Sequence, residues 1–395
     1  MKILSVNAGS SSLKFRLYEM PEETLLMKGM FERIGEVGSE YSIKIGDLKI
    51  QDKVVLKTHT DAVHILIDQI LKNGLVKSLD EIGAVGHRIV HGGNKYSKSV
   101  LITKRVIDEL EEISDLAPLH NPAHLMGIRA FKEAVPDTKM VVCFDTAFHQ
   151  TMKEATYLYS VPYEWYTKYD VRKYGFHGLS HQFVTNRMQE ILARPDVNLI
   201  ICHIGNGASI SLIEHGKCID TSMGFTPNAG IMMGTRCGDI DYSMLVYIMK
   251  KTGLTMPQID TILNKESGLQ GIAGMSDLRD LDRSYEAKEK KAVLAFTMYI
   301  NRIVEYIAKY HIKIDHLDAI CFTAGGGEND TIIRREVLKK LAPLGIYLDA
   351  DKNEETVVRN NKEGIITTDN SKIPCYVVAT DEELMIARDT YKLVI

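Results

Sequence analysis

Near the start of the chain stands Val6-Asn7-Ala8-Gly9-Ser10-Ser11-Ser12-Leu13-Lys14-Phe15, a turn of small residues between two strand-forming runs. The pattern predicts a β-hairpin made by residues 3–6 and 13–18. Glycine and serine at the tip let backbone N–H groups and hydroxyls approach an anion, and Lys14 adds a charge suited to a phosphate. Asn7 offers a neutral oxygen to a metal ion or its water. An ordinary hairpin turn explains the same residues, and the spacing is not that of a P-loop.

The opening pattern returns halfway along the chain, where residues 199–212 again read as strand, small-residue tip and strand. Gly9 aligns with Gly207 and Ser11 with Ser209, which predicts two related halves. We expect the two hairpin tips to face one ligand across a cleft. A third glycine turn, at 324–329, follows a predicted strand and precedes a predicted helix, a corner that suits close approach to a nucleotide.

Length and composition indicate an ordinary two-domain protein. The chain has 395 residues, 45% hydrophobic and 25% charged, and domains usually run to about 100–200 residues. Its net charge is only −4 with no long basic block, so neither nucleic acid nor a membrane surface is an expected partner. A basic cluster at 334–340 is interpreted as a solvated helix face. The six cysteines form no Cys-x-x-Cys pair, and no targeting signal is evident, which together predict free thiols in the cytoplasm.

The rest of the chain alternates between strand and helix patterns, as in an α/β protein. Asn121 is the expected N-cap of a helix with Pro122 at its first position. Thr380 and Glu383 have the spacing of a capping box, which leaves Glu382 free for other work. Strands are expected within 40–58 and at 82–85, 139–144, 318–323 and 374–379, and helices at 61–71, 103–116, 181–193, 293–310 and 380–390.

Polar residues gather at the predicted strand ends and in the glycine-rich turns, where ligands of open α/β sheets bind. Arg88 and Arg236 lie in such turns and suit bidentate contacts to carboxylate or phosphate, although a surface salt bridge explains either one alone. The pairs His87/His91 and His177/His181 have the spacing of zinc ligands on a helix, but glycines surround both and no His-Glu-x-x-His is present. The other members of this polar set are Asn7, His120, Asp145, His177, Asn206, Asp277 and Glu382.

At these residues the chain resembles the acetate kinases, of the superfamily that includes sugar kinases, actin and the large heat-shock chaperones. The resemblance is carried by nine segments in order: 7–14, 86–93, 118–122, 144–149, 174–181, 203–207, 233–241, 324–329 and 380–388. It implies an α/β protein with a duplicated actin-like (ribonuclease H-like) fold, two domains around a nucleotide cleft. Residues 1–148 plus 378–395 form the first domain, and 149–377 form the second, with nucleotide-binding and dimer contacts.

The resemblance also implies the reaction and its residues. The reaction is reversible Mg-ATP-dependent phosphorylation of acetate to acetyl phosphate by a homodimer, with Mn²⁺ able to replace Mg²⁺. Asn7 and Glu382 hold the metal. The catalytic set is Arg88, His120, Asp145, His177, Asn206 and Arg236, and the acetate pocket is Arg88, Val90, Leu119, Phe176 and Pro227. ATP or ADP contacts Ser10, Ser12, Lys14, His203, Ile204, Gly205, Asn206, Gly207, Asp277, Leu278, Arg279, Gly325, Gly326, Gly327, Glu328 and Asn329.

The family pattern is not matched everywhere. Asn228 and Ala229 replace an expected Leu-Glu, Cys237 an expected Ser, Tyr242 an expected Pro and Gly326 an expected Ile, yet every charged catalytic group is present. Asp145 is interpreted as an orienting residue or as the electrostatic partner of an arginine or Mg²⁺. Val90 is expected to share the strand face of Arg88. The alternatives are a propionate or butyrate kinase and a non-catalytic actin-like nucleotide-binding protein.

Overall fold

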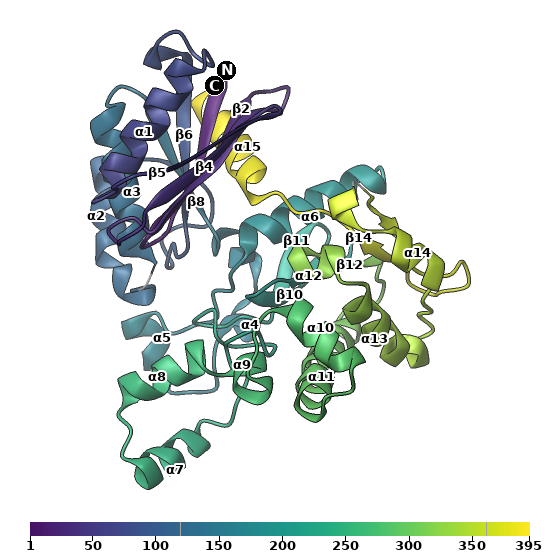
Figure 1. Cartoon of the computed structure of the whole chain (residues 1–395). Helices are drawn as coiled ribbons and strands as arrows, with labels where there is room; N and C mark the ends of the chain where they lie inside the picture. Colours follow the sequence, from purple (N-terminus) through teal and green to yellow (C-terminus); the bar gives the residue numbers. More distant parts are fainter. Residues whose placement is uncertain (119, 361) are drawn as a thin grey trace. The chain divides into compact units, whose positions relative to one another are not determined.

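The computed structural model describes residues 1–118, 120–360 and 362–395, which form two compact units (Figure 1). The first unit comprises Met1–Phe148 and Asp381–Ile395, and the second comprises His149–Thr380. Residues 378–380 therefore group with the second unit, although the sequence placed them in the first. The reason is hydrogen bonding, since Val378 N donates to Phe322 O and Thr380 N to Glu328 Oε1.

The first unit is built on an eight-stranded sheet of order β5-β4-β3-β2-β1-β6-β8-β7. Neighbours from β1 to β5 are antiparallel, whereas β1, β6 and β8 run parallel. The predicted opening hairpin is confirmed as β1 paired with β2. The strands are β1 (Lys2–Ala8), β2 (Ser12–Glu19), β3 (Thr24–Glu32), β4 (Glu40–Ile45), β5 (Leu48–Lys53), β6 (Ile82–Ile89), β7 (Val100–Leu101) and β8 (Lys139–Phe144).

Strand alternation gives this sheet two buried faces. Leu4 and Val6 pack into the core shared with α1 (His59–Lys72) and α3 (Asn121–Ala134), while Ile3 packs with Ala387 of α15 (Glu382–Val394). Figure 1 shows α15, in yellow, across the sheet from α1 and α3. Close approach of α15 requires Gly86 in β6, because a Cβ there would lie 2.2 Å from Thr390 Oγ1. The last helix of the chain is thus part of the first unit.

The second unit repeats this arrangement with a six-stranded sheet of order β11-β10-β9-β12-β14-β13. Its β9–β10–β11 run is antiparallel and its β9–β12–β14 run is parallel, which matches β1–β2–β3 and β1–β6–β8 of the first unit. The two predicted hairpins occupy equivalent places, so the duplicated actin-like fold is confirmed. The strands are β9 (Leu199–Ile204), β10 (Ala208–Glu214), β11 (Lys217–Thr221), β12 (Ala319–Thr323), β13 (Gly364–Ile365) and β14 (Cys375–Val377).

Helices cover the second sheet and extend beyond it. The long α11 (Lys290–His311) buries an apolar face that includes Phe296, Ile300 and Ile303. Among the described residues no helix is long and apolar enough to cross a membrane. The other helices of this unit are α4 (Glu154–Tyr157), α5 (Glu164–Tyr169), α6 (Gly178–Ile191), α7 (Ser243–Thr252), α8 (Met256–Lys265), α9 (Gly268–Ala273), α10 (Leu278–Glu286), α12 (Ala324–Asn329), α13 (Thr331–Leu341) and α14 (Ala350–Glu355); the first unit also has α2 (Lys104–Glu112).

Two predicted helix caps are wrong. The N-cap of α3 is His120, and the Asn121 side chain instead binds the His91 backbone, accepting from its N–H at 3.2 Å and donating to its carbonyl at 3.0 Å. The N-cap of α15 is Asp381, whose Oδ1 accepts from Leu384 N at 2.8 Å. The capping box at Thr380 is therefore absent, and its residues take part in longer-range contacts.

The basic cluster at 334–340 is also not a wholly solvated face. Arg334 is completely buried on α13, where its guanidinium donates to carbonyl oxygens of Gly327, Asn353 and Thr356 at 2.9–3.0 Å. Burial lowers the pKa of Arg334 to about 10, which still leaves it charged near neutrality. Only the lysines of the cluster fit the prediction.

Candidate active site

The first unit brings Arg88, Asp145 and Glu382 together. Strand β6 continues to Ile89, beyond its predicted end, so Arg88 lies on the strand and Asp145 directly follows the parallel strand β8. Arg88 Nε lies 3.1 and 3.2 Å from the two Asp145 oxygens, and Nη2 lies 2.5 Å from Oδ2. Glu382 Oε2, at the start of α15, lies 3.9 Å from Arg88 Nη1. Burial raises the pKa of Glu382, although Arg88 opposes that shift.

Asn7 and Glu382, both in the first unit, carry the types of oxygen donor that suit Mg²⁺. An amide oxygen and a carboxylate are hard ligands, and Mg²⁺ is usually held by one or two carboxylates together with substrate phosphates and water. Within residues 1–118, 120–360 and 362–395 there is no group of three His, Cys, Asp or Glu placed to hold a metal.

Lys14, predicted to contact ATP, is engaged by the neighbouring carboxylate. It lies opposite Asn7 in the β1–β2 register, and its Nζ forms an ion pair with Glu383 Oε1. Arg16 Nη2 lies 3.3 Å from Glu383 Oε2. Glu383 is therefore neutralised by two cations, which explains why it does not cap α15. Lys14 remains about half exposed, with 47% of its side chain accessible.

The second unit holds a cluster of imidazoles around His177. This residue is the N-cap of α6 and adopts a left-handed backbone conformation, with φ of 58°. Its Nδ1 lies 2.9 Å from Ser209 Oγ, and Nε2 of His181, one turn along α6, lies 2.8 Å from the same oxygen. The ring of His203 stacks on that of His177 with centroids 4.1 Å apart. His149 binds the residue that precedes His177, because its Nε2 donates to Phe176 O.

Arg236 reaches the same place. A Cβ at Gly207 would lie 3.2 Å from Arg236 Nη1 and 3.4 Å from His177 Nε2, so the hairpin tip brings the two side chains together. Arg236 Nη1 donates to Pro227 O at 3.1 Å, and no carboxylate among the described residues contributes to the pKa shift of the guanidinium. Burial lowers the pKa of Arg236. Asn206 packs against Gly234, where a Cβ would lie 2.2 Å from its Oδ1.

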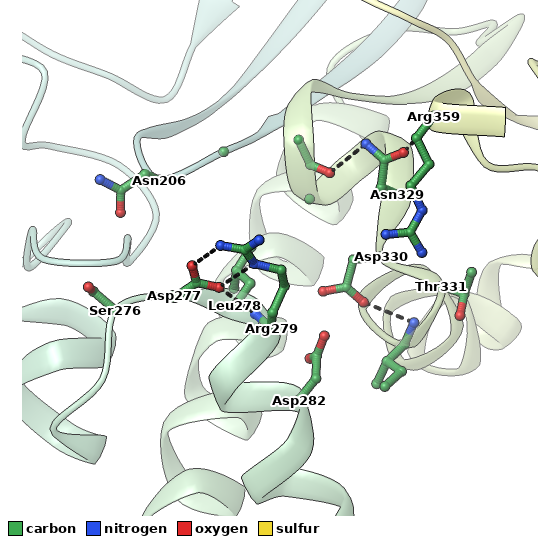
Figure 2. A pocket seen from close by; sticks show the side chains of 14 residues that line it. Asn206, Ser276, Asp277, Leu278, Arg279, Asp282, Asn329, Asp330, Thr331 and Arg359 are labelled. Atoms are coloured by element: carbon green, nitrogen blue, oxygen red, sulfur yellow. Dashed lines mark hydrogen bonds and ion pairs between the residues drawn. The ribbon is translucent and has the colours of Figure 1, made fainter. Parts of the chain in front are cut away.

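A pocket of about 730 Å³ opens beside this cluster within the second unit (Figure 2). Eight of the residues expected to contact nucleotide line it: Gly205, Asn206, Asp277, Leu278, Arg279, Gly325, Gly326 and Asn329. Six further lining residues were not predicted from the sequence: Ser276, Asp282, Asp330, Thr331, Ile332 and Arg359. Of these six residues, Asp330 is the one that a sequence pattern could have indicated, because an Asp before Thr331 is a typical helix N-cap.

Other expected nucleotide contacts lie elsewhere. Glu328 turns inward, and its Oε1 accepts from Ala324 N at 3.0 Å and Thr380 N at 2.9 Å. Gly327, His203, Ile204 and Gly207 are not among the lining residues of the pocket. Ser10 lines a separate cavity of about 350 Å³ in the first unit. Ser12 is the first residue of β2, and its carbonyl accepts from Gly9 N at 2.8 Å.

The predicted acid pocket is divided between the units. Val90 is buried in the first unit but follows the end of β6, so strand alternation does not place it beside Arg88 as expected. Phe176 is buried next to His177, and Pro227 accepts from Arg236, both in the second unit. Leu119 lies outside the described residues. His120, of the predicted catalytic set, begins α3 in the first unit.

Two carboxyl groups, Asp282 and Asp330, interact on the pocket wall and point toward each other in Figure 2. In the described part of the chain, Asp282 Oδ1 and Asp330 Oδ2 are buried without a hydrogen-bond partner. Burial, with the charges of Asp330 and Glu286 adding to it, raises the pKa of Asp282 far above its ordinary value. Asp282 therefore keeps its proton to a higher pH in the folded chain than in the unfolded chain.

This proton makes stability depend on pH. A carboxyl whose folded pKa exceeds its unfolded pKa favours the native state at low pH and loses that contribution as pH rises. We expect the melting temperature to fall between pH 5 and pH 8, and to fall less in Asp282→Asn. Asp280→Asn, at an exposed position of the same helix, should keep the wild-type slope. Equal slopes in wild type and Asp282→Asn would show that the pair does not share a proton.

Comparison with known proteins assigns the chain to a family. Residues 2–388 match the family described as the Acetokinase family. An acetate kinase of Geobacillus sp. (strain WCH70) is 52% identical over 395 residues, covering 99% of this chain and 98% of that protein. The crystal structure of Porphyromonas gingivalis acetate kinase is 42% identical, with a TM-score of 0.94 and full coverage of both chains. A propionate kinase from Francisella tularensis subsp. tularensis SCHU S4 is 41% identical, with a TM-score of 0.94 and 99% coverage of both. The chain is a kinase and belongs to the acetokinase family.

Proposed function

We propose that the chain transfers the γ-phosphoryl group of Mg-ATP to acetate, giving acetyl phosphate and ADP, and catalyses the reverse reaction. The observation that carries this proposal is Arg236. A half-buried guanidinium with no carboxylate partner in the described structure is costly unless an anion joins it. His177 lies beside it across Gly207, and a nucleotide-sized pocket begins at Gly205 and Asn206.

Phosphoryl transfer to acetate requires positioned substrates and positive charge rather than a strong base. Acetate is already ionised at pH 7, so one of its oxygens attacks the γ-phosphorus directly while the bond to the β–γ bridging oxygen breaks. The leaving ADP takes that electron pair. Arg88, Arg236 and His177 offset the charge on the transferring group, and Asp145 orients Arg88. Asn7 and Glu382 would hold Mg²⁺, which when bound offsets charge on the phosphate oxygens.

We propose that Val90, Phe176 and Pro227 enclose the methyl group of acetate. One of these is branched, one is aromatic and one is a rigid ring, so the space should be short. An added methylene that cannot be accommodated costs about 1–3 kcal/mol, or roughly 10–200-fold in kcat/KM. The fold alone does not determine which carboxylic acid is the substrate, because the solved propionate kinase resembles the chain as closely as the acetate kinase does.

Val90→Ala is therefore expected to raise kcat/KM for propionate relative to acetate by at least several-fold. Shortening the side chain makes room for one methylene without touching a charged group. Val85→Ala, in the buried middle of the preceding strand β6, controls for general loosening of that strand and should leave the ratio unchanged. If wild type already uses propionate as well as acetate, or if Val90→Ala leaves the ratio unaltered, the pocket assignment is wrong and a propionate kinase is favoured.

One assay tests the proposed reaction. Purified protein is incubated with ATP, Mg²⁺ and hydroxylamine, together with acetate, propionate or butyrate, and the hydroxamate formed from the acyl phosphate is measured. We expect rapid hydroxamate formation with acetate, slower formation with propionate and very little with butyrate. Nucleotide binding without any hydroxamate would favour a non-catalytic actin-like protein, and a maximum at propionate or butyrate would favour the corresponding kinase.

We also propose a cytoplasmic homodimer. All six cysteines are free, as expected of a protein that folds in a reducing compartment. Helix α7 carries exposed Met244, Val246, Tyr247 and Ile248, an apolar surface of the kind that subunits cover. Sedimentation at low micromolar concentration should give twice the chain mass, and a monomer at that concentration would contradict the assembly.

A further inference from the structure

Beneath the hairpin tip of the second unit, two serine hydroxyls form hydrogen bonds with histidine ring nitrogens: Ser209 with His177 and His181, and Ser180 with His203. Ser209 Oγ, fully buried on β10, lies between His177 Nδ1 at 2.9 Å and His181 Nε2 at 2.8 Å. A hydroxyl has one hydrogen to donate, so Ser209 donates to one of these rings and accepts from the other. Which ring receives the hydrogen decides where His177 carries its own proton.

The His181 ring settles the direction. His181 is fully buried, and burial holds its pKa well below the ordinary value, so it is neutral and carries a single N–H. Its Nδ1 is buried without a hydrogen-bond partner in the part of the chain that the structure describes. A buried N–H without an acceptor is costly, so the hydrogen belongs on Nε2, where Ser209 Oγ can accept it. Ser209 then donates its hydrogen to His177 Nδ1.

We propose that the His181–Ser209 pair fixes His177 in the neutral form that carries its proton on Nε2. That nitrogen lies 3.4 Å from a Cβ position at Gly207, and Arg236 Nη1 lies 3.2 Å from the same position. His177 thereby presents an N–H donor to an anion without carrying a charge. Protonating Nδ1 as well would require Ser209 to turn its hydrogen away and His181 to move its own hydrogen to the unpartnered Nδ1. Ser209 and His181 are thus positioning residues, and the consequence for catalysis rests on the proposed function.

A second hydroxyl orients the neighbouring imidazole in the same way. Thr380 Oγ1 donates to Ser180 Oγ at 2.8 Å, and Ser180 Oγ lies 2.7 Å from His203 Nδ1. Ser180 is completely buried, and His203 Nδ1 is the acceptor that remains for its hydrogen. His203 then carries its proton on Nε2, which lies 3.7 Å from a Cβ position at Gly205. The stacked rings of His177 and His203 therefore both place Nε2 near the hairpin tip.

Several titratable and charged groups lie near His177 in the described part of the second unit. His203 stacks on it, Arg236 approaches Nε2, and His181 acts through Ser209, with His149 5.5 Å from the His181 ring. Arg236 disfavours a second positive charge nearby, and this contribution is present whether or not Ser209 is. Removing the Ser209 hydroxyl therefore isolates the hydrogen bond, because it deletes one donor and leaves every charge in place.

The test is nitrogen NMR on protein labelled with ¹⁵N-histidine, in wild type, Ser209→Ala and Ser211→Ala, with His177 assigned by loss of its signals in His177→Gln. Ser211 is the matched control, since it is a fully buried serine on the same strand that binds Thr221 Oγ1 instead. In wild type we expect His177 to carry its proton on Nε2. In Ser209→Ala the titration of His177 should move up by about one pH unit, giving about tenfold more imidazolium at a given acid pH.

Two results would overturn the proposal: a proton on Nδ1 of neutral His177 in wild type, or the same His177 titration in wild type and Ser209→Ala. If Ser209→Ala does not fold, the wild-type spectrum still shows which nitrogen of His177 carries the proton. Ser209→Thr keeps the hydroxyl and should therefore keep the wild-type titration of His177. Kinetics separate this inference from the proposed reaction. The pH profile of kcat for Ser209→Ala should gain an ionisation near pH 6–7. The NMR result stands by itself if the protein makes no acyl phosphate.

Discussion

Arg236→Ala is expected to reduce kcat for acetyl phosphate formation by about 10³–10⁵ while leaving the protein folded. A single arginine that stabilises the charge of a transferring phosphoryl group contributes a factor of this size. Stability should not suffer, because Arg236 is partly desolvated and has no carboxylate partner in the described structure. The melting temperature is therefore expected to stay unchanged or to rise slightly.

The control for Arg236→Ala is Arg302→Ala, which removes an exposed arginine paired with Glu305 on the surface of α11. An exposed pair of this kind contributes little, so both activity and melting temperature should remain near wild type. Arg236→Lys should recover only a small part of the lost rate, since an ammonium group does not reproduce the bidentate geometry of guanidinium. Near-normal turnover by folded Arg236→Ala would remove Arg236 from the reaction.

Arg88→Ala is expected to lose activity by a similar factor but also to lose stability, by about 3–5 kcal/mol. Arg88 forms a bidentate pair with Asp145, whose side chain is only 2% exposed, and it approaches Glu382. Its removal leaves Asp145 and Glu382 close together without the guanidinium that pairs with them. Arg88 lowers the pKa of Glu382, so its loss raises that pKa further. Because a raised carboxyl pKa costs stability as pH rises, the variant should be more stable at pH 5 than at pH 8.

A double variant separates the two consequences. Arg88→Ala/Asp145→Asn removes the unpaired carboxylate together with the arginine, so chemical denaturation should show most of the lost stability restored. Activity should stay as low as in Arg88→Ala, because the cation proposed to contact the phosphoryl group is still missing. If the double variant regained activity with stability, Arg88 would be a structural residue. If Arg88→Ala were as stable as wild type, the buried Arg88–Asp145 pair would not contribute to the stability of the fold.

Short-range patterns predicted the two hairpins and the polar residues at strand ends, because strand period and small-residue turns are local properties. Strand β3 was not predicted, since Gly29 interrupts its pattern and glycine weakens a strand signal. The structure explains that glycine: a Cβ there would lie 2.5 Å from Ser42 O and 2.7 Å from Phe15 Cζ. The need for it comes from neighbouring strands, which local sequence does not reveal.

The errors at the candidate site have the same origin. Glu383 has the spacing of a capping residue, but Lys14 and Arg16, from the other end of the chain, bind it instead. Arg334 belongs to a basic run yet is buried, because carbonyl groups from later loops accept its hydrogens. The unpredicted wall of the nucleotide-sized pocket comes from three separate segments. In each case tertiary contacts outweigh the local pattern.

We propose that acetate attacks the γ-phosphorus directly, while Arg88, Arg236 and His177 hold the phosphoryl group and no side chain of the protein becomes phosphorylated. His177, Asp145 and Glu382 are the side chains that a covalent route would phosphorylate. The measurement that separates the routes uses ATP made chiral at the γ-phosphorus with oxygen isotopes, followed by determination of the configuration in acetyl phosphate. One in-line displacement inverts the configuration, and inversion is the result we predict. Net retention would require two displacements and would make one of those three residues a phosphorylated intermediate.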